Sequence, residues 1–535
     1  MFDGQSHAVD AVVIGAGFSG LYQLYRLREL GMTTRVFEAG GDVGGTWYWN
    51  RYPGARCDSF SAQYSYSFSP ELEQEWEWSE TYPAQPEILR YLNHVADRFD
   101  LRREITFNTR VSSAHYDPAA NRWTVTTDSG ATVAATYLIT AVGCLSTPNK
   151  PSFPGIDDFK GAVYHTGLWP HAGVDFSGRR VGVIGTGSTG IQAIPVIAEQ
   201  AGQLYVFQRT PNFSFPARNR AVTPEEIAET KANYHELRAI LRASPGGLTY
   251  GIDPQGSALE VSAEERERTF EGLWNRGGWA PLLAYTDLQI NLAANNHLAD
   301  FVRRKIASIV KDPATARVLT PTDHPIGTKR PPMDTNYFET YNRPNVTLVD
   351  VRNAPIEAIT EKGLRTGGKE YELDAIVFAT GFDAMTGPLF RIDIRGKDGM
   401  ALKEKWAGGP KTYLGIQSEG FPNLFMITGP GSPSVLSNMP VSIEQHVEWI
   451  SDCLKYMREH DLARIEPLHE AEEAWVAHVN EVANYTLYPL ANSWYIGANI
   501  PGKPRIFMPY VGGVGNYRQK CAEVAARGYE GFALT

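Results

Sequence analysis

The sequence predicts an α/β protein made of two nested Rossmann-like dinucleotide-binding units with a helical insertion. Three observations support this fold class. Two glycine-rich turns each lie between an aliphatic strand and an amphipathic helix, which is the context that a dinucleotide-binding turn requires. Each turn also has a later aliphatic strand that runs into small residues, and one long stretch carries helix start signals. The 535 residues exceed what one hydrophobic core can organise, so several domain-sized units are expected.

The first unit begins with residues 8–15 (AVDAVVIG), a short aliphatic run that is typical of a parallel strand buried on both faces. The turn GAGFSG follows, with glycines at Gly15, Gly17 and Gly20. After it, apolar side chains recur at helical spacing up to Gly31, which ends the predicted helix. We expect a second strand to end at Glu38 and a late strand to lie within residues 136–148.

The second unit repeats this order 170 positions later. A strand at residues 180–184 precedes the turn GTGSTG, a helix at 191–202 and a strand at 204–210. Its late strand lies within residues 374–384. The glycines of this turn are Gly185, Gly187 and Gly190. In both units glycine lets the backbone approach a pyrophosphate, whose charge then lies at the positive end of the helix.

The residue eighteen positions after the last glycine of each turn indicates the cofactor. In the first unit it is Glu38, an acid placed to accept hydrogen bonds from a ribose hydroxyl pair. In the second unit it is Gln208, followed by Arg209 and Thr210. A carboxylate would repel a 2′-phosphate, whereas a guanidinium binds it with two hydrogen bonds. We therefore expect FAD in the first unit and NADPH in the second; the alternative is that Arg209 is only a solvated charge at a strand end.

Helical patterning dominates from Thr223 to about residue 321, where Thr223 and Ser262 each have glutamate three residues later and predict capping boxes. This stretch is the expected insertion. Clusters of proline and glycine near residues 148–155 and after Thr380 predict the crossings between the units. The expected boundaries are an FAD-binding domain at 1–145 and 383–535, an NADPH-binding domain at 146–216 and 326–382, and the insertion at 217–325.

Composition excludes several classes of protein. With 50 Lys and Arg against 60 Asp and Glu, the net charge of −10 gives no basic surface for a nucleic acid. The four cysteines are far apart and favour a reducing compartment. The sequence has no long apolar run, and residues 1–15 lack the features of a signal peptide, so we expect a cytoplasmic protein without a membrane partner. We expect a monomer with no metal site, because neither heptads nor an H-E-x-x-H motif are present.

The segment GGTWYWNRYPGARCD at residues 44–58 predicts a loop that faces a cofactor. Its glycines, prolines and charged groups cannot all be buried without partners. Thr46 and Trp47 are therefore expected to be near a cofactor, and Asp58 is either a functional carboxylate or a member of a structural salt bridge.

Residues 159–170 (FKGAVYHTGLWP) match the pattern F-x-G-x-x-x-H-x-x-x-W-P, and they lie between the two glycine turns. By this pattern the chain resembles the type I Baeyer-Villiger monooxygenases. The similarity extends over nearly the whole chain, through GGTWYWNRYPGARCD, FQRTP, GTKRP, VFATGFDA, GPGSPSVLSNM and SWYIGANIPGKPR, and it is greatest to the phenylacetone monooxygenase branch. The fingerprint histidine, His165, is expected to be a structural or conformational element rather than a general base.

The resemblance implies a flavoenzyme that uses NADPH and O2 to convert aryl, cyclic or steroid-like ketones to esters or lactones through a C4a-peroxyflavin. It implies that Arg330 lies over the flavin and that Asp58 holds and tunes this arginine. It also implies that Lys329 joins Arg209 on the 2′-phosphate and that Trp494 belongs to a late segment that closes over the nicotinamide cofactor. The substrate-pocket loop would contain Ser434, Val435 and Leu436.

Three alternatives remain. An N- or S-oxygenating flavin monooxygenase would share both glycine turns, but the Trp169-Pro170 pair and the Lys329-Arg330 pair argue against it. A pyridine-nucleotide disulfide reductase needs a closely spaced cysteine pair, which the sequence lacks. A binding protein that keeps two nucleotide sites without catalysis is the third alternative, and a failure of ketones to stimulate NADPH oxidation would favour it.

Overall fold

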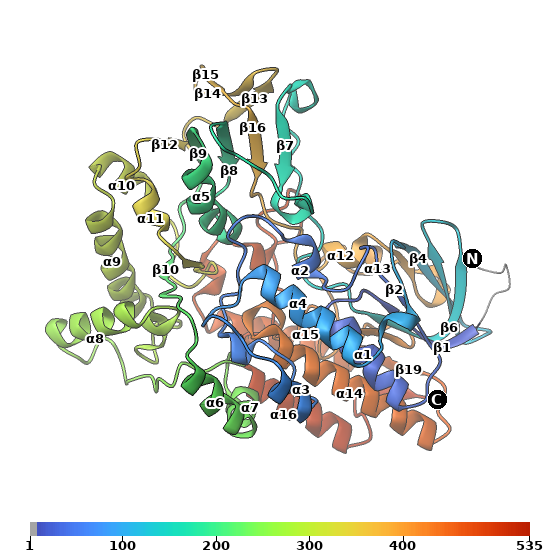
Figure 1. Cartoon of the computed structure of the whole chain (residues 1–535). Coiled ribbons are helices and arrows are strands. Elements are labelled where there is room, and N and C mark those ends of the chain that lie inside the picture. Colours follow the sequence, from blue (N-terminus) through green and yellow to red (C-terminus); the bar gives the residue numbers. More distant parts are fainter. Residues whose placement is uncertain (1–7) are drawn as a thin grey trace.

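The computed structural model describes residues 8–535 and contains two large sheets flanked by helices, with the helical insertion beside the second of them (Figure 1). The expected absence of a signal peptide rests partly on residues 1–7, which lie outside the described residues. No helix within residues 8–535 is long and apolar enough to cross a membrane.

The first sheet is built around β1 (Ala8–Ile14), which pairs in parallel with β2 (Thr34–Phe37) and with β6 (Thr132–Thr140). Ala11, Val12 and Val13 are fully buried, as expected of a strand covered on both faces. Helix α1 (Phe18–Glu29) connects β1 to β2, and Gly31 follows it with φ +67. The sheet order is β17-β4-β5-β6-β1-β2-β3, with β18 paired to β6. The other strands are β3 (Ile105–Thr106), β4 (Val111–Asp117), β5 (Arg122–Thr127), β17 (Asp393–Arg395) and β18 (Leu424–Met426).

The second sheet is entirely parallel, in the order β12-β9-β8-β16-β7. Its elements are β7 (Ala162–His165), β8 (Arg180–Ile184), α5 (Ser188–Gln200), β9 (Gln203–Gln208), β12 (Val346–Asp350) and β16 (Ala375–Phe378). Because parallel strands end on one edge, the residues after β8, β9, β12 and β16 meet there, which is where such sheets bind ligands.

The two sheets draw their strands from separate parts of the chain. The first uses strands within residues 8–140 and 393–426, and the second uses strands within 162–208 and 346–378. Short contacts join the two crossings, because Asn149 N donates to Gly381 O at 2.8 Å. The exact domain boundaries remain a prediction.

The insertion contains α6 (Pro224–Ala232), α7 (Tyr234–Ala243), α8 (Ala263–Arg276), α9 (Leu292–Ile309) and α10 (Pro313–Leu319). The capping box at Thr223 is complete, with reciprocal bonds to Glu226. The capping box predicted at Ser262 forms only the first of its two hydrogen bonds, so the prediction of the second bond is wrong. The Ser262 hydroxyl accepts from Glu265 N at 3.2 Å, but the Glu265 carboxylate returns no bond and stays exposed, where water competes for it.

Helices from the end of the chain complete the first unit. Helix α14 (Met439–Glu459) packs on α1, and Gln23 Nε2 donates to Ser451 Oγ at 3.2 Å between them. The late helices α15 (His469–Asn484) and α16 (Val514–Ala526) lie on the same side of the molecule (Figure 1). All four cysteines are buried and free.

Candidate active site

The N-terminus of α1 is a cradle made of backbone. Gly15 has φ +108, and a Cβ on Gly20 would lie 1.8 Å from Gly15 O, so both positions require glycine. Gly17 and Gly45 approach each other so closely that a Cβ on Gly45 would lie 2.9 Å from Gly17 Cα. No side chain caps α1, which leaves its first amides free for an anion. These features fit a pyrophosphate of FAD.

The N-terminus of α5 has the same construction with a more open centre. Gly185 has φ +109, and a Cβ on Gly190 would lie 2.2 Å from Gly185 O. A Cβ on Gly187 would meet no protein atom within 4 Å. Gly187 is also the uncapped N-cap of α5. The second cradle therefore leaves room for a nucleotide pyrophosphate above the helix.

Glu38 lies directly after β2, as expected. It is 5% exposed, and its carboxylate accepts from Ala16 N at 2.7 Å and from Gly40 N at 2.6 Å. Burial raises the pKa of Glu38, while the bonds from Gly40 and Ala16 oppose that rise. The carboxylate thus joins the glycine turn to the next loop, and its remaining lone pairs are available for ribose hydroxyls.

Three cations meet at the ends of β9 and β12. Arg209 is exposed directly after β9, and the adjacent Thr210 carbonyl accepts from Thr186 Oγ1 at 3.2 Å. Arg352, after β12, donates from Nε to Arg209 O at 3.1 Å. Burial lowers the pKa of Lys329, as do the charges of Arg209 and Arg352, whereas Asp323 opposes the fall. Lys329 therefore lies within electrostatic range of Arg209, and Arg352 adds a third positive charge.

The Arg330 guanidinium is held by groups from three parts of the chain. Nε and one terminal nitrogen donate to the two oxygens of Asp58, both at 3.0 Å. The other terminal nitrogen donates to Val435 O at 3.0 Å, and the guanidinium carbon lies 4.7 Å from the ring centre of Trp279. Such a forked pair fixes the orientation of a guanidinium, and stacking on an aromatic face adds to it.

Electrostatics keep Arg330 charged. Burial alone would lower its pKa, but the charge and hydrogen bonds of Asp58 raise the pKa above its ordinary value. Tyr495 lies close enough that the charge of Arg330 opposes the rise that burial causes in the tyrosine pKa. Tyr495 follows Trp494 in the short 3-10 helix η9 (Trp494–Ile496), and their rings lie 4.3 Å apart. The late segment therefore reaches Arg330 through Tyr495, while Trp494 is half-buried beside it.

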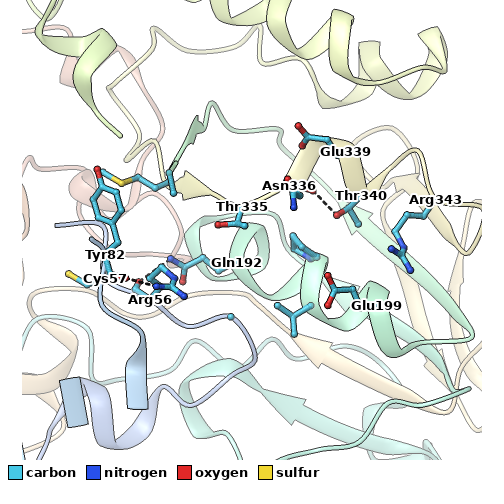
Figure 2. Close-up of a pocket in the computed structure, with 15 residues that line it drawn as sticks. Arg56, Cys57, Tyr82, Gln192, Glu199, Thr335, Asn336, Glu339, Thr340 and Arg343 are labelled. Atoms are coloured by element: carbon cyan, nitrogen blue, oxygen red, sulfur yellow. Dashed lines mark hydrogen bonds between the residues drawn. The ribbon is translucent and has the colours of Figure 1, made fainter. Parts of the chain in front are cut away.

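The loop that carries Asp58 lies against α5 of the second unit. Tyr52 OH donates to Gln192 Oε1 at 2.8 Å, and Gln192 Nε2 donates to Arg56 O at 3.0 Å. A Cβ on Gly54 would lie 2.4 Å from Gln192 O. Beside these contacts is a cavity of about 340 Å³ between the loop, α5 and α11 (Tyr337–Thr340), in which Arg56, Cys57 and Gln192 form one wall (Figure 2). Arg330 and residues 434–436 do not line this cavity.

The expected pocket residues form the 3-10 helix η7 (Ser434–Leu436). Ser434 is fully buried with φ 44, and its hydroxyl lies 3.0 Å from Cys144 Sγ. Val435 is buried and acts through its carbonyl on Arg330, while Leu436 is half-buried. The side chain of Ser434 therefore packs inside the first unit, and Leu436 is the more exposed member of the three.

Thr46 and Trp47 differ in exposure. Thr46 is exposed at the start of α2 (Thr46–Trp49), one residue after the Gly45 that approaches the first cradle. Trp47 is buried and donates from Nε1 to Tyr64 OH at 3.2 Å. Thr46 is thus positioned to face a ligand at α1, whereas the Trp47 indole nitrogen is already paired in the core.

His165 lies between the two crossings. Its Nδ1 accepts from Gly167 N at 3.0 Å, and Nε2 lies 3.2 Å from Asn149 O and 3.3 Å from Thr380 Oγ1. Burial lowers its pKa, so the neutral ring is favoured. Because both nitrogens already have partners, this geometry fits the expected structural role better than that of a general base.

Sequence reasoning missed several residues that the fold brings to the site. Trp279, Tyr495 and Arg352 each contact a predicted residue from a distant part of the chain. Arg352 follows a strand end at the same edge as Arg209, so the position of β12 beside β9 was the signal that could have found it. Trp279 has no motif that marks it.

Comparisons with known proteins agree with this geometry. A family model described as flavin-binding monooxygenase-like matches residues 8–227. A Baeyer-Villiger monooxygenase of Pseudooceanicola batsensis is 48% identical over 525 residues, which is 97% of this chain and 95% of that protein. A phenazine N-monooxygenase of Lysobacter antibioticus is 44% identical over 539 residues and covers 100% of this chain and 98% of that protein. The solved structure of an oxidized steroid monooxygenase bound to NADP is 54% identical, with a TM-score of 0.94 and 99% of each chain covered.

The two cradles, the fold and these matches define a flavoprotein monooxygenase with an FAD unit and an NADP unit. Within this class the chain belongs to the Baeyer-Villiger monooxygenases, which convert ketones to esters or lactones with FAD, NADPH and O2. The fold class, both cofactors and the ketone-oxidising activity predicted from the sequence are therefore confirmed.

Proposed function

We propose that Arg330 is the cation that promotes oxygen insertion into the ketone, and that Asp58 is its positioning residue. The three contacts of the guanidinium carry this proposal. Three of its five N–H groups donate to Asp58 and Val435, and the remaining N–H groups on the terminal nitrogens lie near Tyr495, where they can donate to reacting oxygens. Arginine suits the role because it stays charged at any working pH.

The chemistry divides between cofactors and protein. When bound, FAD and NADPH supply the reducing equivalents and the activation of O2. Arg330 stabilises negative charge that develops on oxygen during attack at the ketone carbonyl, and a fixed donor needs no reorganisation at that moment. The segment that contains Trp494 and Tyr495 excludes water from the guanidinium. At the other cofactor, Arg209 and Lys329 bind the 2′-phosphate of NADPH.

For the substrate we propose a bulky aryl, cyclic or steroid-like ketone, with the chain in the phenylacetone monooxygenase branch of the family. The 54% identity to a steroid monooxygenase supports a large substrate. The segment GPGSPSVLSNM, which contains the η7 residues, supports the branch. Leu436, as the exposed member of η7, would contact the ketone.

The test uses the purified flavin-loaded enzyme with NADPH and one ketone of each kind, and it measures ester or lactone formed per NADPH consumed. We expect product close to one per NADPH for at least one bulky ketone and a lower yield for a small aliphatic ketone. Products from the small ketone alone would contradict the substrate proposal.

N-oxygenation is a second candidate, because a 44% identical relative is a phenazine N-monooxygenase. A tertiary amine and an aromatic N-heterocycle, assayed beside the ketones, distinguish the two. N-oxide without ester from any ketone would favour this candidate over ours.

We also propose a monomer that acts in the cytoplasm. Four buried, free cysteines support a reducing compartment. Light scattering on the flavin-loaded protein tests the monomer, and a mass of two chains would contradict it.

A further inference from the structure

Two of the three cations near the ends of β9 and β12, Lys329 and Arg352, lie beside one carboxylate. Asp323 Oδ2 lies 3.5 Å from the terminal nitrogen of Arg352 and 3.9 Å from Lys329 Nζ. Its other oxygen lies 2.8 Å from His324 Nδ1. Arg352 in turn donates to the Arg209 carbonyl. A single acid therefore connects the loop before Arg330 to both strand ends.

We propose that Asp323 is a positioning residue that determines coenzyme preference, by holding Lys329 and Arg352 beside Arg209 in the arrangement that binds a 2′-phosphate. This inference rests on the proposed binding of the 2′-phosphate by Arg209 and Lys329.

Charge balance explains why a carboxylate belongs in a site for an anion. Three cations and one carboxylate have a net formal charge of +2, which matches the charge of about −1.5 to −2 on a phosphate monoester. Without Asp323 the three cations would repel one another, and Lys329, with 18% of its side chain exposed, could not escape fully into water.

His324 fixes the carboxylate on its other side. It is 5% exposed, and burial lowers its pKa, so the neutral ring donates from Nδ1 to Asp323. Asp323 itself has 36% of its side chain exposed and Arg352 has 40%. Ion pairs this exposed contribute little to stability, so removing the Asp323 charge is expected to change binding rather than folding.

The proposed role of Asp323 also predicts how 2′-phosphate binding changes with pH. The charged groups that face Lys329 are Asp323, Arg209 and Arg352, and the neutral His324 lies behind Asp323. Burial and the two arginines lower the Lys329 pKa, and only Asp323 raises it. In Asp323→Asn the lysine therefore loses its proton at a lower pH, so the affinity for a 2′-phosphate falls earlier as pH rises.

The experiment measures binding of 2′,5′-ADP and 5′-AMP to the flavin-loaded protein by calorimetry. For Asp323→Asn we expect 2′,5′-ADP to bind about fivefold to thirtyfold more weakly at about pH 7, with a larger loss at about pH 9. The affinity for 5′-AMP should stay within about twofold of that of the unmodified protein, because 5′-AMP lacks the 2′-phosphate that the three cations bind. Asp323→Glu should restore part of the affinity. Glu267→Gln removes an exposed acid of α8 that pairs with Arg304 of α9, so it is the matched control and should change the binding of neither nucleotide.

Unchanged or tighter 2′,5′-ADP binding in Asp323→Asn would overturn the inference, because the acid would then only oppose the phosphate. Equal losses for both nucleotides, or a loss that does not grow with pH, would also overturn it. Arg209→Ala distinguishes a failure of the proposed role of Asp323 from a failure of the proposed 2′-phosphate site. If Arg209→Ala weakens 2′,5′-ADP binding and Asp323→Asn does not, only the proposed role of Asp323 is wrong. If Arg209→Ala still prefers 2′,5′-ADP over 5′-AMP as strongly as the unmodified enzyme, the proposed 2′-phosphate site is wrong as well.

Discussion

At the scale of single residues, the orientation of Arg330 depends on Asp58 more than on any other group. Asp58 accepts two of its three hydrogen bonds, and Val435 O accepts the third. The carboxylate both orients the guanidinium and raises its pKa. Trp279 covers one face of the guanidinium.

We expect Asp58→Asn to retain flavin but to form less ester. The amide keeps the shape and loses the charge, and hydrogen bonds to charged groups contribute roughly 1.5–3 kcal/mol, which corresponds to about tenfold to a hundredfold in ester formation. The measurement is ester and hydrogen peroxide per NADPH, with flavin content as the control. Full ester yield from this variant would mean that Asp58 does not position Arg330.

At the scale of elements, two glycines of the second glycine-rich turn serve different purposes. Gly190 is required by packing, because a Cβ there would lie 2.2 Å from Gly185 O. Gly187 has no protein atom within 4 Å of a Cβ and an ordinary φ of −80, so the fold itself would tolerate alanine. We expect the pyrophosphate of the coenzyme to occupy the space at Gly187.

A matched pair of variants tests this difference. Gly190→Ala should lower the free energy of unfolding by about 1–3 kcal/mol, as overpacking typically does. Gly187→Ala should lower it by about 0.5–1 kcal/mol, because alanine is a poorer N-cap residue than glycine, yet weaken NADP+ binding, because the methyl group occupies the approach of the pyrophosphate. Calorimetric unfolding and NADP+ titration are the two readouts. Equal NADP+ affinity in Gly187→Ala and the unmodified enzyme would show that the coenzyme does not approach this glycine.

At the scale of the whole molecule, the groups that contact Arg330 come from several distant segments of the chain. Arg330 follows the insertion, in the second unit, whereas Asp58 and Val435 come from the first unit and Trp279 comes from the insertion. Gln192 on α5 holds the loop that carries Asp58 against the second unit (Figure 2). The relative position of the two units therefore influences the position of Asp58.

Gln192→Leu should weaken this connection without touching either cofactor cradle. The substitution keeps the volume and removes two hydrogen bonds of about 0.5–1.5 kcal/mol each. We expect flavin reduction by NADPH at an unchanged rate and a larger share of NADPH consumed without ester. Gln203→Leu is the control, because Gln203 bonds only within the second sheet, to Thr347 and Leu204. Identical ester yields in the two variants would contradict a role for the loop contact.

Local pattern predicted the parts of this structure that local physics determines. The strands, the glycine turns and the positions of Glu38 and Arg209 follow from spacing alone, because each turn and its helix lie within one short segment. Long-range contacts could not be predicted in this way. The Val435 carbonyl contacts a residue 105 positions away, whereas the sequence predicted only that Val435 belongs to a substrate-pocket loop. The capping pattern at Ser262 predicted the hydrogen bond of the serine hydroxyl correctly but not that of the glutamate, because solvent competes for Glu265.

The central claim is that the fixed Arg330 guanidinium promotes oxygen insertion. Its most direct test is Arg330→Ala, assayed for flavin reduction by NADPH and for ester formed from a ketone that the unmodified enzyme accepts. We expect flavin reduction to persist while ester formation falls about a hundredfold to a thousandfold, the usual cost of removing one preorganised stabiliser. Ester formation close to that of the unmodified enzyme would contradict it.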